Sequence, residues 1–333
     1  MKKSLIYILL AVFSLLQSCE KRPKSIQLSG NALGTTFHIK YFGEKNYAKA
    51  IDSTINTVNA SLSTYHKNSL ISRINQGDTT VIIDKMFKDV YSISKKVYQE
   101  SNGYFDPTVG VLVNAWGFGP EKEFNQLNKS TIDSLMQYVG FDKIKLVNNK
   151  IIKANKNIYI DFNADAKGYA IDRIGALFKQ KHIANYIIEL GGEILAKGKN
   201  MASIKAWTVA IDNPNQKETN KLIAQVQLYD EAMATSGNYR KFKIDKKTGA
   251  RYVHTINAKT GYAQQSDILS ASVIVKDCGT ADAYATTLMA LGLEKSKEFL
   301  AKHPEIDAYL IYSKNGKTKV FSTKGFAERL VEL

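Results

Sequence analysis

The 333-residue sequence predicts an α+β protein, a single large domain with mixed or antiparallel sheets and flanking helices. Three observations favour this class. The β-rich runs are short and scattered along the whole chain, several of them are joined by hairpin turn residues, and only one strand-helix-strand unit is clear. A doubly wound parallel sheet would alternate strands and helices throughout. Hydrophobic side chains make up 44% of the residues, enough for a substantial core, and no linker, repeat or low-complexity tract divides the chain.

The first twenty residues have the layout of a signal peptide. Two lysines precede an apolar run over residues 5–16, and this run leads to Ser18-Cys19. The run is too short to cross about 30 Å of hydrocarbon as a stable helix. We therefore expect cleavage before Cys19, which removes residues 1–18.

The residues at this cleavage point resemble a bacterial lipobox, whose cysteine is diacylated on sulfur, although Gln17 replaces the small residue usual there. We expect a lipid on Cys19, a membrane tether over residues 19–25 and a folded domain over residues 26–333. The protein would then be exported and lipid-anchored to the cell inner membrane, facing the periplasm. An ordinary secreted protein and a retained N-terminal anchor remain open, and both place the domain outside the cytoplasm.

The chain is strongly basic, with a formal net charge of +15 that becomes +13 when residues 1–18 and their two lysines are removed. An exported protein seldom meets nucleic acid, so an anionic membrane surface, a phosphorylated ligand or an acidic protein is the sensible partner. A solvated lysine-rich surface explains the charge equally well. If Cys19 carries lipid, Cys278 has no intrachain partner and no disulfide framework supports the fold.

The first elements of the domain are a strand pair and two helices. Alternating apolar and polar residues over 26–29 and 36–41 indicate paired strands. Apolar residues at helical spacing indicate a helix over 51–62. A second helix follows Asp84 as its N-cap and ends at Gly103.

A strand-helix-strand unit follows. Three short β-rich runs over 143–161 predict a meander that ends at Asp161, and a helix over 166–179 comes directly after it. This helix leads into an apolar strand over 186–190, which stops at Gly191-Gly192.

The remaining elements are mostly strands. The sequence predicts them over residues 207–211, 222–228, 239–244, 251–256 and 269–275. A helix capped by Thr280, another near 294–302 and a hairpin that turns at Asn315-Gly316 complete the domain.

Common catalytic motifs are missing from the sequence. It contains no Walker loop, no Gly-x-Gly-x-x-Gly after a strand, no paired histidines at metal spacing and no Gly-x-Ser-x-Gly elbow. Another pattern has to carry the chemistry.

The most informative cluster opens a helix at 279–287 and places Asp282 four residues before Thr286. On a helix this spacing puts the carboxylate and the hydroxyl on one face, as two hard oxygen ligands of the kind that magnesium prefers. Taken alone, the pair is better explained as an acid near a helix start and a threonine bonded to its own helix.

Three further clusters contain polar or aromatic residues beside glycine. Residues 161–172 place an acid, a turn and a lysine at a helix start, which can present carbonyls and a cation to a phosphate. Residues 101–120 form a loop rich in glycine and aromatics, suited to a flat ring. Residues 235–239 and 252–261 add hydroxyls, a histidine and a glycine turn. Each cluster alone also has a plain structural explanation, such as a capped helix, a packed surface loop or a structural histidine.

Together and in this order, the clusters resemble the FAD:protein FMN transferases, the ApbE family of bacterial lipoproteins, over essentially the whole mature chain. The matching segments are residues 30–35, 63–75, 103–120, 161–172, 190–193, 235–239, 254–261 and 281–286. The resemblance implies a magnesium-dependent transferase that cleaves FAD and attaches FMN through a phosphoester bond to a threonine hydroxyl of an acceptor flavoprotein. AMP is released.

The resemblance also implies site residues. The Mg²⁺ ligands would be the backbone carbonyl of Ala164 and the side chains of Asp282 and Thr286, an all-oxygen set. Asp282 would thereby act in catalysis, and His254 would take the proton of the acceptor hydroxyl. The contacts to FAD would be Leu33, Tyr65, Tyr104, Phe105, Asp106, Asp161, Lys167 and Ile256.

Three departures from the family pattern stand out. Leu33 replaces the methionine usual before Gly34-Thr35, Asn257-Ala258 replaces the usual Asp-Pro, and Asp165 adds a carboxylate beside the expected metal turn. They put substrate preference in doubt rather than the reaction class.

Three other functions remain open. An FAD pyrophosphatase on the same scaffold would use water in place of the acceptor hydroxyl, and a non-catalytic lipoprotein would hold flavin without cleaving it. A solute-binding lipoprotein would need two similar hinged domains and no acid-threonine pair.

Overall fold

A computed structural model describes residues 24–120, 127–214, 222–238, 242–244, 251–263 and 267–332. Their main element is an eight-stranded sheet with the order β1-β2-β5-β6-β9-β12-β13-β14, in which every neighbouring pair of strands is antiparallel. The strands are β1 (Ser25–Ala32), β2 (Thr35–Phe42), β5 (Tyr186–Leu190), β6 (Glu193–Lys197), β9 (Ala232–Gly237), β12 (Ile268–Val275), β13 (Asp307–Lys314) and β14 (Lys317–Ser322). The predicted α+β class with antiparallel sheets is confirmed.

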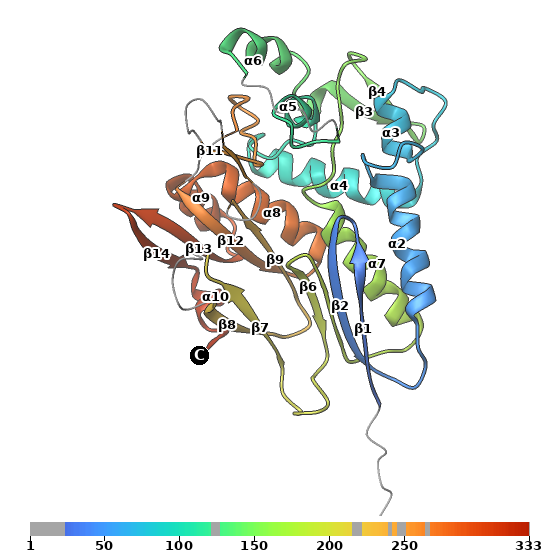
Figure 1. The fold of residues 1–333 in the computed structure, drawn as a ribbon, viewed down its shortest axis with the longest axis vertical. Coiled ribbons are helices and arrows are strands. Elements are labelled where there is room, and N and C mark those ends of the chain that lie inside the picture. Colours follow the sequence, from blue (N-terminus) through green and yellow to red (C-terminus); the bar gives the residue numbers. More distant parts are fainter. Residues whose placement is uncertain are drawn as a thin grey trace, which may run out of the picture.

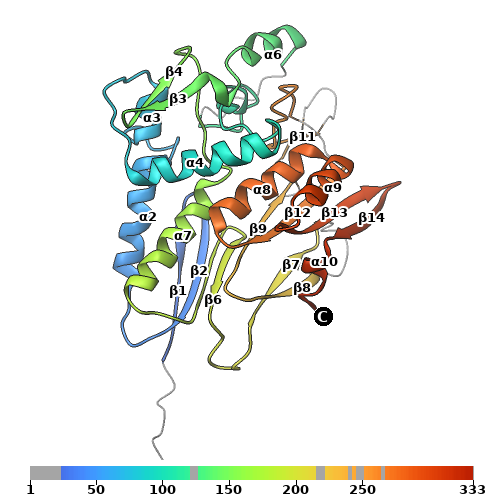
Figure 2. The same ribbon diagram turned by 180° about the vertical axis from the view of Figure 1, so that it is seen from behind.

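Helices cover one face of this sheet and a second sheet covers the other (Figures 1 and 2). The covering helices are α2 (Ala48–Leu62), α4 (Lys85–Glu100), α7 (Ala166–Gln180), α8 (Cys278–Leu291) and α9 (Leu293–Lys302). The second sheet consists of β7 (Trp207–Asp212), β8 (Leu222–Leu228) and β15 (Leu330–Val331), and α10 (Lys324–Ala327) packs near its edge. The central sheet buries side chains on both faces. Separate apolar clusters therefore fill its interface with the helices and its interface with the second sheet.

Smaller elements gather at the upper end of the molecule in Figure 1. They are α3 (Leu70–Asn75), α5 (Gly110–Ala115), α6 (Lys129–Met136), the short 3₁₀ turn Phe141–Lys143, the hairpin of β3 (Ile144–Val147) with β4 (Lys150–Lys153), and β10 (Phe242–Ile244) paired with β11 (Arg251–Val253). None of the helices in the described ranges is long and apolar enough to cross a membrane.

The two helix starts that matter most are capped by aspartates. The carboxylate of Asp84 accepts the N–H of Phe87 at 2.8 Å at the start of α4, as predicted. Helix α8 begins after Asp277, whose carboxylate accepts the N–H of Thr280 at 2.9 Å. The expectation that Thr280 caps this helix is therefore wrong, because the acid three residues earlier supplies the acceptor.

Several boundaries differ from the sequence prediction. The helix after Asp84 ends at Glu100, and Gly103, with φ of +74°, closes the turn beyond it by donating its N–H to Tyr98. The third run of the expected meander is not a strand, so Asp161 lies in an irregular segment, held by a 2.8 Å hydrogen bond from its N–H to the carbonyl of Pro107. The strands β3 and β4 form their own sheet and do not flank β5.

Two central strands were missed by the sequence prediction, β6 and β9. The strand expected over 239–244 is present only as β10, and residues 239–241 lie outside the described ranges. The expected hairpin at Asn315-Gly316 is confirmed, and both residues have positive φ, +53° and +72°.

Candidate functional site

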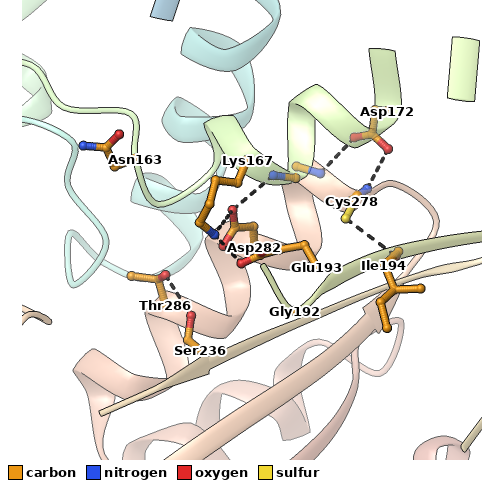
Figure 3. Close-up of polar contacts among 12 residues, drawn as sticks. Asn163, Lys167, Asp172, Gly192, Glu193, Ile194, Ser236, Cys278, Asp282 and Thr286 are labelled. Atoms are coloured by element: carbon orange, nitrogen blue, oxygen red, sulfur yellow. Dashed lines mark hydrogen bonds and ion pairs between the residues drawn. The ribbon is translucent and has the colours of Figure 1, made fainter. Parts of the chain in front are cut away.

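The site is built where the start of α7 meets the start of α8. A Cβ added to Gly168 would lie 2.1 Å from the carbonyl oxygen of Cys278, so only glycine allows this approach. The carboxylate of Asp172, one turn further along α7, accepts the N–H groups of Cys278 at 2.9 Å and Gly279 at 2.8 Å (Figure 3). Helix α7 therefore fixes the first turn of α8.

This junction brings Lys167, Glu193 and Asp282 together (Figure 3). The ammonium of Lys167 donates a hydrogen bond to Oε1 of Glu193 and lies 3.4 Å from Oδ2 of Asp282. The same Asp282 oxygen accepts the N–H of Gly168 at 3.2 Å. Both carboxylate side chains are 3% exposed and the lysine side chain is 28% exposed. The cluster is therefore almost enclosed and opens to solvent at the lysine.

Burial and the neighbouring charges shift the pKa values of Asp282 and Lys167. Burial raises the pKa of Asp282 to about 7, Lys167 opposes this rise and Glu193 adds to it. Burial lowers the pKa of Lys167, but the two carboxylates outweigh burial and raise it above its ordinary value. The lysine therefore keeps its charge, and a metal cation beside Asp282 would favour the ionised form of that carboxylate.

One turn beyond Asp282, the hydroxyl of Thr286 lies 3.2 Å from that of Ser236 on β9 (Figure 3). The neighbouring Thr287 instead donates its hydroxyl hydrogen to the carbonyl of Ala283 in its own helix, at 2.8 Å. The half-buried Thr286 side chain thus faces the same junction as Asp282, as the four-residue spacing predicts.

The third predicted ligand, the backbone carbonyl of Ala164, lies in the turn before α7. The carboxylate of Asp161 accepts the N–H of Asn163 at 2.8 Å, which shapes the turn, and the half-buried Ala164 packs against the apolar cluster that contains α8 residues. The buried Asp165 accepts a hydrogen bond from the hydroxyl of Ser94, and its Oδ1 has no partner among the described residues. Burial raises the pKa of Asp165 well above its usual range.

The donor atoms of Ala164, Asp282 and Thr286 are all oxygens, as Mg²⁺ requires. A carbonyl, a carboxylate and a hydroxyl are hard oxygen donors, the kind that Mg²⁺ prefers. Within the described ranges, no group of three or more His, Cys, Asp or Glu is placed to hold a metal. The set of Ala164, Asp282 and Thr286 contains one acidic side chain, so it leaves coordination positions for phosphate oxygens. The donor chemistry fits, and the metal site itself stays a prediction.

Among the predicted FAD contacts other than Lys167, three are accessible. Tyr65 is 54% exposed and donates its hydroxyl hydrogen to the carbonyl of Phe118 at 3.3 Å. Tyr104 is half-buried, and the ammonium of Lys295 lies 4.7 Å from the centre of its ring. Leu33 is half-buried with φ of +51°, and it packs against two apolar clusters.

Other predicted contacts are buried and hold the surrounding loops. Phe105 belongs to the core beneath α8. Asp106 accepts the N–H and the hydroxyl hydrogen of Thr108 at 2.8 and 2.6 Å and the N–H of Phe141 at 3.0 Å. Ile256 packs beside Trp116, whose indole N–H donates to a backbone carbonyl at 2.9 Å. Their contact with FAD remains a prediction.

The predicted general base follows β11. His254 is half-buried, and the hydroxyl of the next residue, Thr255, donates to the amide oxygen of Asn238 at 3.3 Å. Asn238 comes two residues after Ser236, the residue that contacts Thr286. This link ties the histidine segment to the end of β9 that borders the junction.

Two residues at the junction, Glu193 and Ser236, lie in segments that match the family pattern, but no role was predicted for either from the sequence. Glu193 begins β6 directly after the Gly191-Gly192 turn, so the turn signal was present, but its partner Lys167 lies 26 residues away. Ser236 meets Thr286 across 50 residues. The predicted lipid site Cys19 lies outside the described residues.

Comparisons with known proteins identify the family of this chain. The ApbE family model matches residues 33–310. An FAD:protein FMN transferase of Haemophilus influenzae is 36% identical over 328 residues, which cover 93% of each chain. Another from Vibrio cholerae is 32% identical over 330 residues, covering 96% of this chain and 97% of its own. The structure of the flavin transferase ApbE from Vibrio cholerae matches with a TM-score of 0.83 at 30% identity, covering 92% of this chain and 100% of that one. This chain belongs to the ApbE family, as its motifs indicated.

Proposed function

We propose that this enzyme transfers the FMN half of FAD to a threonine hydroxyl of an acceptor flavoprotein in a Mg²⁺-dependent reaction that releases AMP. The observation that carries the proposal is the junction of α7 and α8, where Asp282 and Thr286 share one helix face beside Lys167. The names of the relatives, FAD:protein FMN transferase, support the same reaction.

In this proposal the residues at the junction bind the diphosphate of FAD. The carbonyl of Ala164 and the side chains of Asp282 and Thr286 would hold Mg²⁺, which when bound neutralises phosphate charge in the transition state. The partly exposed ammonium of Lys167 offers a second positive charge to the phosphates. Tyr65, which is exposed, and Tyr104 offer aromatic surfaces to the isoalloxazine ring.

The chemical step is a phosphoryl-type transfer. The threonine oxygen of the acceptor attacks the phosphorus of the FMN half, and a new P–O ester bond forms. The bond from that phosphorus to the bridging oxygen breaks, and AMP leaves with the electron pair. His254 accepts the hydroxyl proton, since imidazole titrates near neutral pH.

The test is to incubate the enzyme with FAD and Mg²⁺, with and without EDTA and with and without an acceptor flavoprotein. AMP, FMN and flavin-labelled acceptor are separated by chromatography. Chelator-sensitive AMP together with labelled acceptor supports the transferase. Free FMN with AMP and no labelled acceptor would make the protein an FAD pyrophosphatase. Intact FAD in every sample would leave a flavin-binding lipoprotein.

We also propose that the protein is exported and anchored by a lipid on Cys19, with residues 19–25 as tether. The apolar run over residues 5–16 and the cysteine that follows it support this proposal. Cys19→Ser should move the protein from the membrane fraction to the soluble or unprocessed fraction. An unchanged membrane fraction, together with no incorporation of labelled fatty acid into the parent protein, would contradict lipid anchoring.

A further inference from the structure

The Lys167 ammonium lies between two carboxylates that have different tasks. Asp282 is the proposed metal ligand, and its Oδ2 stands 3.4 Å from the ammonium, near the limit of a hydrogen bond. Glu193 accepts a direct hydrogen bond from the same ammonium. A metal ion on Asp282 would repel this lysine, so the lysine needs another anion to stay in the site.

Glu193 is held rigidly for this role. It is paired with Leu190 across a two-residue hairpin turn, Gly191-Gly192, whose φ values of +67° and +109° require glycine. The carboxylate of Glu189 accepts the N–H of Gly192 at 2.9 Å and braces the turn. The position of Glu193 is therefore set by the sheet and does not depend on Lys167.

The hydrogen bonds of Glu193 differ from those of a structural carboxylate elsewhere in the protein. Its Oε2 is buried and has no hydrogen-bond partner among the described residues. Its other oxygen, Oε1, forms an ion pair with Lys167. By contrast, both oxygens of the buried Glu231 bond to Arg329, at 2.7 and 3.2 Å. An incompletely satisfied buried acceptor is uncommon in folded proteins and needs an explanation.

We propose that Glu193 is a positioning residue that retains Lys167 beside the diphosphate site and prevents its ammonium from closing onto Asp282. The carboxylate of Asp282 is thereby left available to the metal. The inference rests on the proposed metal-dependent function and assigns a task to a residue outside the ligand set. Without Glu193, the lysine has Asp282 as its nearest anion and competes with the metal for it.

A plain structural ion pair makes different predictions. Loss of such a pair lowers thermal stability and has no specific effect on metal affinity. A second substitution, at Lys167, would then not restore metal binding. Metal affinity and the effect of the double substitution therefore separate the two roles.

The test measures Mn²⁺ binding to the full chain by electron paramagnetic resonance of free Mn²⁺, with and without FAD. Glu193→Gln should weaken binding by on the order of 10-fold, because outer-shell partners contribute 10- to 100-fold to metal affinity. Adding Lys167→Met to Glu193→Gln should restore binding to within about threefold of Lys167→Met alone, since the competing cation is gone. Glu231→Gln, a matched buried glutamate with a cationic partner, should lower the thermal midpoint and leave Mn²⁺ binding unchanged.

Turnover provides a second readout. In Glu193→Gln the Mg²⁺ concentration for half-maximal rate should rise by about 10-fold. Unchanged Mn²⁺ affinity in Glu193→Gln, or a double variant as weak as Glu193→Gln, would overturn the inference. No Mn²⁺ binding by the parent protein, with or without FAD, would overturn the metal-dependent function itself.

Discussion

Replacing Gly168 by alanine should separate the two helices that build the site. The new Cβ would lie 2.1 Å from the carbonyl oxygen of Cys278, about 1.3 Å inside the 3.4 Å at which ordinary contact begins. It would also lie 2.5 Å from the carbonyl carbon of Cys278 and 2.8 Å from the amide nitrogen of Gly279, and all three are backbone atoms. No side-chain rotation can relieve these contacts, so α7 and α8 must move apart by on the order of 1 Å.

The expected cost follows from this displacement. Overpacking costs about 1–3 kcal/mol, and the gain of about 1 kcal/mol from alanine in a helix offsets only part of it. A displacement of about 1 Å between Lys167 and Asp282 should lower Mg²⁺-dependent AMP release by about 100-fold. Chemical denaturation measures the free energy of unfolding, and chromatography measures AMP.

Gly175 in the same helix provides the matched control. A Cβ there meets the tip of the Leu195 side chain at 2.6 Å, which can turn aside. Gly175→Ala should therefore keep activity within about threefold of the parent. If the free energy of unfolding of Gly168→Ala lies within about 0.5 kcal/mol of the parental value and the variant releases AMP at the parental rate, the helix junction does not position the site.

Three further substitutions test the proposed metal ligand Asp282, the buried Asp172 and the hydrogen bond of Trp116. Asp282→Asn removes a proposed ligand and should lower Mg²⁺-dependent AMP release by at least about 100-fold while circular dichroism stays unchanged, and parental turnover would rule out the metal assignment. Burial raises the pKa of Asp172 to about 7. Between about pH 4 and 7 the folded protein therefore holds a proton on this group that the unfolded chain has lost. The free energy of unfolding should fall as pH rises through this window. Asp172→Asn should make the fall in the free energy of unfolding between about pH 5 and pH 7 smaller, because Asp282 still contributes to it, and an unchanged fall would assign it to other groups. Trp116→Phe removes the hydrogen bond to the buried carbonyl of Gly261 and should cost about 1–3 kcal/mol in denaturation, with weaker FAD binding, whereas unaltered stability would show that this bond is dispensable.

Local chemistry explains which parts of the fold were predictable. The alternation over β1 and β2, the cap at Asp84 and the turn at Asn315-Gly316 depend on residues close in sequence, and each appears as predicted. Strand β9 was missed because its sequence, Ala232–Gly237, consists mainly of small residues with little strand preference. It becomes a strand because its neighbours β6 and β12 supply hydrogen bonds on both sides.

The site was predictable where its residues belong to recognisable motifs. The side chains of Asp282 and Thr286 reach the junction as their spacing implies. Ala164 packs against the apolar cluster that contains α8 residues, and its role as a ligand stays a prediction. The contribution of Glu193 could not be predicted, because its contact with Lys167 joins a hairpin to a helix start. Nor does the sequence show that Asp106 would use its carboxylate to hold the backbone of Phe141.

The most direct test of the central claim is mass spectrometry of an acceptor flavoprotein after incubation with the enzyme, FAD and Mg²⁺. We predict that the acceptor gains FMN less one water on a threonine, in a quantity equal to the AMP released. EDTA or Asp282→Asn should prevent both changes. An unmodified acceptor beside free FMN and AMP would contradict transfer. An unmodified acceptor beside intact FAD would contradict catalysis at the junction of α7 and α8.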